Sequence, residues 1–262
     1  MNKAKRVIPI WQPFGFSTHK IAKRVGEYYN EKATHTGTLD PLAEGVILIL
    51  VGDARFKKSK YSDYKKTYEF EISLGISTDS YDGMGKIMGY IPDTKQPSKE
   101  KIKKVLSSFS GDYEQEVPLY STIKVEGKSL FEWGHAEKRP KKMPRRRGVL
   151  SRIKLLETRS VSVESIIKQN ISKIRPLKND FRQEEILPLW ENLPKKLGGT
   201  SSKISQIRIK VTTTRGIYIR SLSQDICKKL GVLGFVSTLV RVKNGLYIKS
   251  SCYHYPHDFR ND

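Results

Sequence analysis

The strongest constraint on the fold of this chain is an uninterrupted apolar run at residues 46–51, which directly follows a loop rich in glycine and threonine. An apolar run of this length predicts a strand buried on both faces, although the pattern alone also fits part of a buried helix. The preceding loop contains Asp40, which stands directly before Pro41. Because proline disfavours helical backbone in the residue before it, Asp40 is expected to be extended, at the mouth of the strand.

The residues around Asp40 leave two roles open for its carboxylate. Aspartate beside proline most often serves as a turn or cap residue. Gly37 and Gly45, however, allow backbone or a ligand to come close on either side of the loop. A carboxylate in that setting also lies where a reacting group can reach it.

Charge and cysteine content indicate the kind of partner and compartment. The chain has 262 residues, of which 49 are basic and 27 acidic, so its formal net charge is +22. An excess of this size indicates nucleic acid or another acidic surface as partner. Cys227 and Cys252 are too few for a disulfide framework or a cysteine-based metal site, which is typical of a reducing cytosol. No apolar stretch approaches membrane-spanning length and no signal-peptide pattern begins the chain, so we expect a cytoplasmic protein.

Hydrophobic periodicity predicts both strands and helices. Alternating apolar residues predict further strands at residues 68–74, 87–91, 149–156 and 207–211. Helical spacing and capping residues predict helices at residues 18–28, 98–110, 184–193 and 222–230. A helical turn followed by a strand is expected between residues 236 and 247. Mixed elements with long connections predict an α+β fold built on a largely antiparallel sheet.

Five segments of the chain resemble, in the same order, the TruB-type tRNA pseudouridine synthases. They are residues 12–17, 34–53, 66–82, 117–131 and 215–245. The most specific is Gly-Thr-Leu-Asp-Pro-Leu-Ala-Glu-Gly-Val at residues 37–46, which contains Asp40. The resemblance implies a pseudouridine-synthase-like mixed sheet flanked by helices and loops. It also implies one catalytic domain over residues 1–250, followed by a short C-terminal tail at residues 251–262.

The activity implied by the resemblance is an isomerisation of uridine to pseudouridine in the T-arm loop of tRNA. The uridine would be flipped out, its glycosidic bond broken, and the base rejoined to the ribose through carbon. The resemblance implies neither cofactor nor metal. The expected partner is tRNA, with no membrane association, no protein partner and a monomeric state. Whether Asp40 attacks the base or the ribose stays open.

The resemblance also implies roles for single residues. Catalysis would fall to Asp40 and to Arg220, whose guanidinium would keep the carboxylate ionised. Read without the resemblance, Arg220 is a solvated residue on a helix N-terminal turn. Tyr68 would stack on the target base and is otherwise a half-buried strand aromatic. The residues expected to bind the substrate are Tyr68, His35, Tyr218 and Leu239.

A basic insertion at about residues 124–150 is the expected RNA-gripping surface. Seven of the ten residues from 138 to 147 are basic, and Pro140 and Pro144 predict an extended loop there. The alternative is a solvated loop of like charges. The residues expected to bind RNA are Lys124, Lys128, Arg145, Arg146, Arg147 and Arg241.

Several positions depart from the family pattern. Gln12 replaces a lysine, and the string that begins at Asp82 lacks a second acid. Residues 166–202 have no counterpart in the resembling family, and no C-terminal RNA-binding domain is expected in the short tail. The first rival hypothesis is a catalytically idle RNA-binding or RNA-folding protein on the same fold, against which the intact Asp40, Tyr68 and Arg220 argue. The second is a generic basic nucleic-acid binder, which explains the charge but not the ordered motifs.

Overall fold

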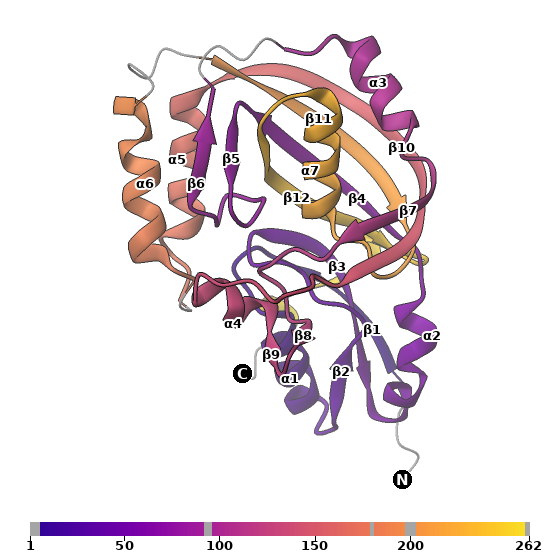
Figure 1. Ribbon diagram of the computed structural model, residues 1–262. Coiled ribbons are helices and arrows are strands. Elements are labelled where there is room, and N and C mark those ends of the chain that lie inside the picture. Colours follow the sequence, from indigo (N-terminus) through magenta and orange to yellow (C-terminus); the bar gives the residue numbers. More distant parts are fainter. Residues whose placement is uncertain (1–5, 92–95, 179–180, 197–202, 260–262) are drawn as a thin grey trace. The chain divides into compact units, whose positions relative to one another are not determined.

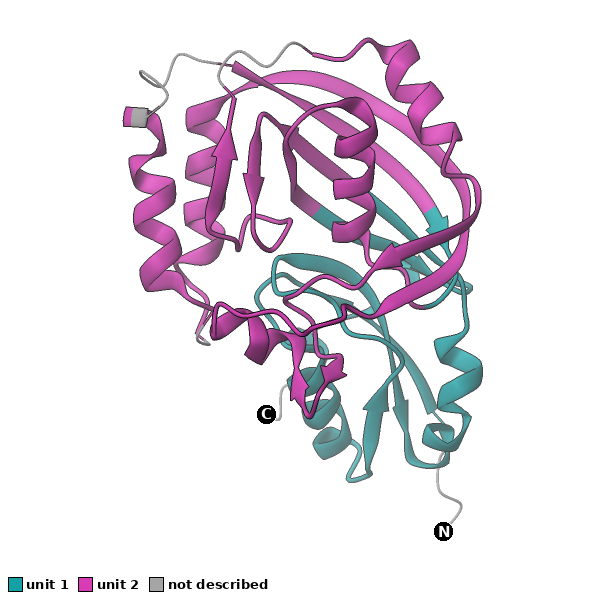
Figure 2. Cartoon of the chain, in the orientation of Figure 1, with its two compact units in different colours: residues 1–69, 212–215, 239–262 teal, residues 70–211, 216–238 magenta. Residues whose placement is uncertain are grey.

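The computed structural model describes residues 6–91, 96–178, 181–196 and 203–259 (Figure 1). The chain divides into two compact units, each assembled from segments that are distant in sequence (Figure 2). Unit 1 comprises residues 1–69, 212–215 and 239–262, and unit 2 comprises residues 70–211 and 216–238. Three strands contribute residues to both units, namely β4 (Lys66–Leu74), β11 (Lys203–Thr213) and β12 (Gly234–Asn244).

Unit 1 is built around β3 (Ala43–Val51), which contains the apolar run. Its residues 46–51 are at most 1% exposed, so the strand prediction is confirmed and the helix alternative is wrong. β1 (Arg6–Gln12) pairs antiparallel with β3 along its whole length. β2 (Ala33–His35) pairs antiparallel with β3, and β12 pairs parallel with it. The N-terminal end of β3 therefore lies between β1 and β12, and these two strands fix the end of the loop that precedes β3.

Helix α1 (Thr18–Tyr28) begins as predicted, because Ser17 Oγ accepts a hydrogen bond from the Lys20 N–H. Its apolar face buries Ile21 and Val25, and the helix packs against β2 and β3. Thr18 is thereby fixed beneath the Asp40 loop. The other elements of unit 1 are η1 (Gly52–Lys57), α2 (Lys58–Ser62), β13 (Tyr247–Ile248), η2 (Lys249–Ser251), β14 (Tyr253–His254) and η3 (His257–Phe259).

In unit 2 the sheet follows the order β12-β4-β11-β10-β7. β10 (Arg145–Ser162) pairs antiparallel with β7 (Gly111–Glu116). α3 (Lys99–Ser107) packs against α7 (Ile219–Leu230), and α5 (Val163–Ile174) packs beside α6 (Gln183–Lys196) (Figure 1). The hairpins are β5 (Ile76–Thr78) with β6 (Ile87–Tyr90), and β8 (Lys124–Val125) with β9 (Lys128–Ser129), which precedes α4 (Leu130–His135). This mixture confirms the predicted α+β class.

Three predicted boundaries are wrong. Helix α3 ends at Ser107 rather than before Gly111, which adopts φ +98° and opens β7. No helical turn precedes the last long strand, since residues 234–244 form β12 without interruption. The basic run is a loop only up to residue 144, because residues 145–147 already pair with β7. Glu114 and Glu116 stand opposite these arginines, and opposite charges stabilise cross-strand pairs.

The segment for which the motifs gave no family counterpart, residues 166–202, contains most of α5 and all of α6. Periodicity missed α5, whereas the helix predicted at residues 184–193 is confirmed and is longer, as α6. α6 contains Pro188 and Pro194, and proline inside a helix costs roughly 3 kcal/mol. Burial of Ile186 and Trp190 on one face offsets this cost. The linker predicted at residues 198–202 lies outside the described residues. No helix of the described ranges is long and apolar enough to cross a membrane.

Candidate active site

The loop that carries Asp40 is held by main-chain hydrogen bonds on both sides of the aspartate. The Asp40 carbonyl accepts a hydrogen bond of 2.9 Å from the Ala43 N–H, and the Pro41 carbonyl accepts one of 2.9 Å from the Gly15 N–H. The Leu39 N–H donates to Thr18 Oγ1 at 3.2 Å. The Asp40 side chain is partly exposed, so a fixed backbone presents a carboxylate that remains reachable.

Gln12, at the position where the family has lysine, supports this loop through Thr18. Its side chain is fully buried, and its Nε2 donates to the Phe16 carbonyl at 2.8 Å. Its Oε1 accepts a hydrogen bond of 2.6 Å from Thr18 Oγ1. Thr18 thus donates to Gln12 while it accepts from the N–H next to Asp40. The replacement of lysine leaves a neutral, structural contact at this position.

Arg241 supports the loop from β12. It is 2% exposed, its Nε donates to the Val46 carbonyl at 2.6 Å, and its Nη2 donates to the Gly37 carbonyl at 3.3 Å. Gly45 adopts φ +128°, and a Cβ at that position would lie 2.3 Å from the Arg241 carbonyl oxygen, so glycine is required there. Arg241 is one of the residues predicted to bind RNA. The structure instead buries this guanidinium against main-chain carbonyl groups.

Two further residues expected to bind the substrate lie on strands of unit 1. Leu239 pairs with Ala43 at the start of β3 and is 7% exposed. Tyr68 lies on β4 and is half-buried, as expected for a strand aromatic. Unit 1 therefore contains Asp40, Tyr68 and Leu239, while the strand register places Leu239 next to the loop end.

Sequence reasoning missed Lys66, which lies two residues before Tyr68 on the same face of β4. It is 5% exposed, and its Nζ donates to the Ser62 carbonyl. Burial, together with the positive charges of Arg241 and Arg215, lowers the pKa of the Lys66 ammonium to about 8. Strongly perturbed pKa values cluster at functional sites. The signal in the sequence was a lysine in an otherwise half-buried strand pattern, two residues before the expected stacking aromatic.

His35 lies at the end of β2, opposite Ile49, and is half-buried. Burial, followed by the positive charge of Lys58, lowers the pKa of His35 to about 4. The imidazole is therefore neutral at physiological pH. Its buried Nδ1 has no hydrogen-bond partner among the described residues. These features agree with a role of His35 in filling space rather than in proton transfer.

Arg220, in the first turn of α7, is buried in unit 2. It is 4% exposed, so the reading of a solvated helix-end residue is wrong. Its Nη1 donates to the Ser80 carbonyl at 3.0 Å and its Nη2 to the Tyr120 carbonyl at 2.9 Å. Its Nε lies 3.7 Å from Asp82 Oδ2. Three acceptors from two separate segments therefore fix the plane of this guanidinium.

Asp82 and Tyr218 complete the surroundings of Arg220. Asp82 Oδ1 accepts hydrogen bonds from Ser80 Oγ at 2.6 Å and from the Met84 N–H at 2.9 Å. The Tyr218 N–H donates to Gln115 Oε1 at 2.5 Å, and its carbonyl accepts from Gln115 Nε2 at 3.0 Å. One buried amide thus holds the half-buried Tyr218 at the position before α7. Tyr218 and Arg220 belong to unit 2, so the structure groups them separately from the predicted residues of unit 1.

The predicted RNA-binding residues of the basic insertion are exposed on strands. Lys124 and Lys128 lie on the β8–β9 hairpin, and residues 145–147 open β10. Arg145 and Arg147 form ion pairs with Glu114 at 3.2 and 3.4 Å. Because side chains alternate along a strand, Arg146 points to the opposite face from these two. The three arginines are therefore not equivalent.

Comparison with known proteins identifies the family. A family model described as TruB family pseudouridylate synthase (N terminal domain) matches residues 24–172, more than half of the chain. The chain belongs to the TruB family. This match contains Asp40, Tyr68 and the whole basic insertion, so the family resemblance found in the motifs is confirmed.

Curated TruB relatives match most of this chain. A protein of Oceanobacillus iheyensis named tRNA pseudouridine synthase B is 32% identical over 242 residues, covering 92% of this chain and 66% of the relative. The protein of the same name from Bacillus subtilis is 30% identical over 251 residues, covering 94% of this chain and 67% of the relative. The TruB chain described here thus spans about two thirds of the length of these relatives.

Solved structures show the same fold. A Cbf5–Nop10–Gar1 complex matches with a TM-score of 0.59 and 20% identity, covering 96% of this chain and 52% of that chain. An archaeal box H/ACA sRNP Nop10–Cbf5 complex matches with a TM-score of 0.55 and 19% identity, covering 97% of this chain and 52% of that chain. At this identity the likeness concerns the fold alone, and it confirms the predicted fold class of this TruB member.

Proposed function

We propose that this protein is a tRNA pseudouridine synthase that isomerises a uridine in the T-arm loop of tRNA. The observation that carries the proposal is the Asp40 loop of a TruB member, held on both sides and presenting a reachable carboxylate. Relatives named tRNA pseudouridine synthase B, about 30% identical over nine-tenths of the chain, support the substrate class. The net charge of +22 supports a polyanionic substrate.

The proposed reaction conserves all atoms of the substrate. The bond between the ribose and the base nitrogen breaks, the base turns, and a bond from the ribose to the base carbon forms. That carbon loses a proton and the freed nitrogen gains one. Asp40 acts as nucleophile and leaving group, or as base, at either the base or the ribose. A second proposed catalytic residue is Arg220, whose fixed guanidinium favours a carboxylate partner. Its pairing with Asp40 stays a prediction that rests on family membership.

The remaining assignments concern substrate binding. We propose that Tyr68 stacks on the flipped base, a contact worth roughly 1–3 kcal/mol. Leu239 and Tyr218 are proposed as apolar walls for the nucleotide, and neutral His35 fills space beside it. RNA phosphates are proposed to bind the exposed residues Lys124, Lys128, Arg145, Arg146 and Arg147. No protein partner is part of the proposal, and light scattering of the purified chain tests the expected monomer.

The test of the proposal is tritium release from transcribed tRNA that carries carbon-5-labelled uridine. The purified protein is expected to release tritium, and Asp40→Asn is expected to abolish release while tRNA binding stays within a few-fold of the wild type. This follows because the carboxylate acts in the transition state, whereas phosphate contacts supply affinity. Glu44→Gln, which removes another acid of the same segment, is the matched control and is expected to stay active.

Two results would overturn these assignments. Appreciable turnover by the Asn variant would remove Asp40 from the chemistry. Tight tRNA binding by a wild-type protein that releases no tritium from any tRNA would instead favour the RNA-folding hypothesis.

A further inference from the structure

The helix pair α5–α6, of which α6 lies beyond the residues that the family model matches, contacts the loop that contains Asp82. Both helices belong to unit 2 and lie beside the β5–β6 hairpin (Figure 1). Residues 79–86 join β5 to β6. Three side chains from these helices or from the residue directly before α6 reach this loop, and each makes a different kind of contact.

The first contact is an ion pair between Arg182 and Asp79. Arg182 stands directly before α6 and is 8% exposed. Its Nη1 and Nη2 donate to Asp79 Oδ2 and Oδ1 at 2.8 and 3.2 Å, which is the bidentate geometry of a strong arginine–carboxylate pair. Its guanidinium also stacks over the ring of Tyr120, 4.1 Å from the centroid. The Tyr120 hydroxyl completes the triangle by donating to Asp79 Oδ2 at 2.9 Å.

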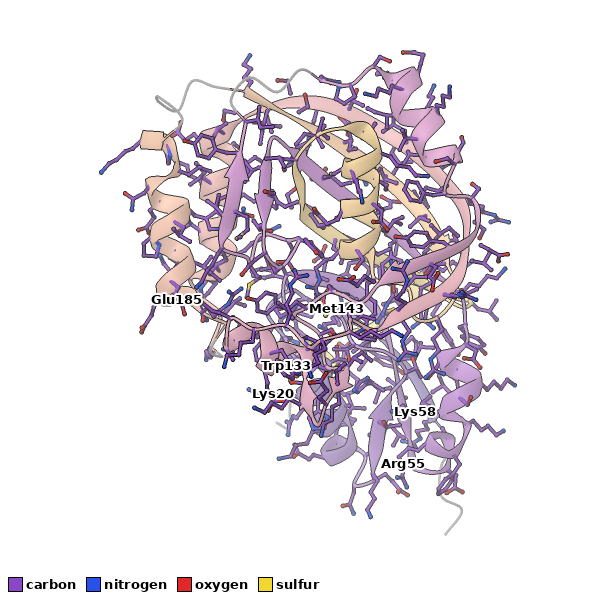
Figure 3. All side chains as sticks on the ribbon, viewed as in Figure 1. Lys20, Arg55, Lys58, Trp133, Met143 and Glu185 are labelled. Atoms are coloured by element: carbon purple, nitrogen blue, oxygen red, sulfur yellow. The ribbon has the colours of Figure 1, made fainter. Side chains whose placement is uncertain are left out.

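The other two contacts involve loop residues that follow Asp82 in the sequence. Glu185, labelled on α6 in Figure 3, forms an ion pair with Lys86, which also pairs with Glu137 at 2.6 Å. Asn170 of α5 is 1% exposed and packs against Gly83, where a Cβ would lie 2.6 Å from Asn170 Oδ1. The helix pair therefore fixes the loop before, beside and after Asp82.

Arg182 and Arg220 contact the same two segments of the chain, one at residues 79–80 and the other at Tyr120. Arg182 holds Tyr120 by its ring and Asp79 by its carboxylate. Arg220 donates to the main-chain carbonyl of that Tyr120 and to the carbonyl of Ser80, the residue after Asp79. The acceptors that orient Arg220 thus belong to, or adjoin, the residues that Arg182 fixes.

We propose that Arg182 is a positioning residue for Arg220, and that the α5–α6 pair stabilises the active arrangement of Arg220 through Asp79 and Tyr120. This inference rests on the proposed function, since it assigns Arg220 to the same reaction. Without Arg182, Asp79 keeps hydrogen bonds from Tyr120 and from the Lys86 N–H, the latter at 2.8 Å, but loses its buried cationic partner. Removing one member of a buried pair leaves a poorly compensated charge, so the loop is expected to rearrange.

The decisive variant is Arg182→Met, which keeps an apolar side chain over Tyr120 and removes the ion pair. We expect its single-turnover rate constant on tRNA to fall roughly 10- to 100-fold, because small displacements of a catalytic group cost this much. The Kd for tRNA is expected to stay within about twofold, since Arg182 is buried away from phosphate. Arg175→Met is the matched control, because Arg175 directly follows α5, is exposed, and pairs with Glu191 of α6 at 2.9 Å. The control is expected to retain the wild-type rate.

A second measurement monitors the conformation of the loop at residues 79–86 and does not depend on enzyme activity. The N–H groups of Lys86 and Met84 donate to the carboxylates of Asp79 and Asp82, so their hydrogen exchange reports on the loop. Exchange in peptides covering residues 78–86 is expected to become faster in Arg182→Met and to stay unchanged in Arg175→Met. If the methionine variant does not fold, the double variant Arg182→Met with Asp79→Asn removes both charges and is expected to fold with the same loss of rate.

The outcomes separate this inference from the proposed function. A wild-type protein that makes no pseudouridine refutes the function, while hydrogen exchange still tests the link between Arg182 and the loop. An active wild type with a folded Arg182→Met variant at the wild-type rate refutes the positioning role. Equal losses of rate and tRNA affinity, or unchanged exchange at residues 78–86, also overturn it.

Discussion

The Asp40 loop of unit 1 and the Arg220 turn of unit 2 are both held firmly, but by different chemistry. Around Asp40 most of the contacts are neutral, from main-chain groups, the Gln12 amide and the Thr18 hydroxyl. Around Arg220 the contacts involve charges, because Asp82 faces the guanidinium and Arg182 pairs with Asp79 nearby. The first arrangement is largely local in sequence, whereas the second joins segments about 100 residues apart.

This difference predicts different responses to substitution. Neutral hydrogen bonds contribute about 0.5–1.5 kcal/mol each and depend little on salt or pH. Buried charges respond more strongly, because the loss of one partner leaves the other charge uncompensated. The neutral contacts near Asp40 are therefore expected to depend little on salt and pH, while removal of one charge near Arg220 is expected to be the more disruptive change.

The largest effect is expected for Arg220→Lys. Lysine keeps the charge but loses the planar fork, so one ammonium cannot reproduce the contacts to Ser80, Tyr120 and Asp82. We expect the single-turnover rate to fall roughly 100-fold or more, with tRNA affinity within a few-fold. Rapid-quench assays and a binding titration measure the two quantities. Arg215→Lys, at an exposed arginine, is the control, and a near-normal rate for the Arg220 variant would contradict its catalytic assignment.

The second largest effect is expected for Lys66, a buried charged residue of unit 1. Its folded-state pKa is about 8, below the usual 10.5, so between these values the unfolded chain binds more protons and stability rises with pH. Below about pH 8 the folded state carries the full cost of the buried ammonium. Lys66→Met is therefore expected to raise stability at pH 7 by about 1–2 kcal/mol, allowing for the lost Ser62 hydrogen bond.

The same variant is expected to lower turnover at least about tenfold, because a site that retains a costly charge does so for function. Thermal unfolding at pH 7 and at pH 10.5 gives the stability term, and the gain should shrink at the higher pH. Unchanged turnover would make Lys66 a structural residue, and a loss of stability at pH 7 would show that its hydrogen bond outweighs its desolvation.

The two regions also differ in how far the sequence reveals them. The Asp40 loop, β3 and α1 follow from contiguous patterns, namely an apolar run, a proline and a serine cap. The burial of Arg241 could not be predicted from charge alone. Only the parallel pairing of β12 with β3 brings its guanidinium to the carbonyl groups of Gly37 and Val46.

The contacts around Arg220 could not be predicted from local sequence patterns. Arg182 and Asp79 are 103 residues apart, and nothing near either residue indicates the other. Local periodicity predicted the centre of α6 despite its prolines but missed α5. The stability of α6 comes from burial, for example of Trp190 against Phe235. Local periodicity records propensity, whereas these contacts depend on tertiary packing.

A smaller effect is expected for the two buried glutamines that hold the two regions. Gln12→Leu removes the acceptor of Thr18, and Gln115→Leu removes the partner of both main-chain groups of Tyr218. Each variant leaves buried polar groups unsatisfied and should lower stability by about 1–3 kcal/mol. Gln12→Leu should also reduce turnover about tenfold, because the backbone beside Asp40 loosens. Urea unfolding measures the stability of the two variants, and single-turnover assays measure their turnover. Equal losses of turnover in Gln12→Leu and Gln115→Leu would contradict the proposed difference between the two regions.

The smallest effect is expected at the start of β10, where Arg146 and Arg147 are neighbours and both are exposed. The two arginines differ in their contacts with acidic residues. Arg147 already faces Glu114, at 3.4 Å, while strand alternation turns Arg146 to the other face. If Arg146 contacts a phosphate, Arg146→Ser removes one counterion-releasing charge and lowers the slope of log affinity against log salt by about 0.7–0.9. Arg147→Ser should change the slope less, because Glu114 competes with phosphate for that guanidinium. Binding titrations of tRNA across a series of salt concentrations measure both slopes.

Equal slopes for the two variants would mean that Glu114 releases Arg147 when RNA binds. An unchanged slope in both variants would mean that these arginines are solvated and do not bind RNA phosphates.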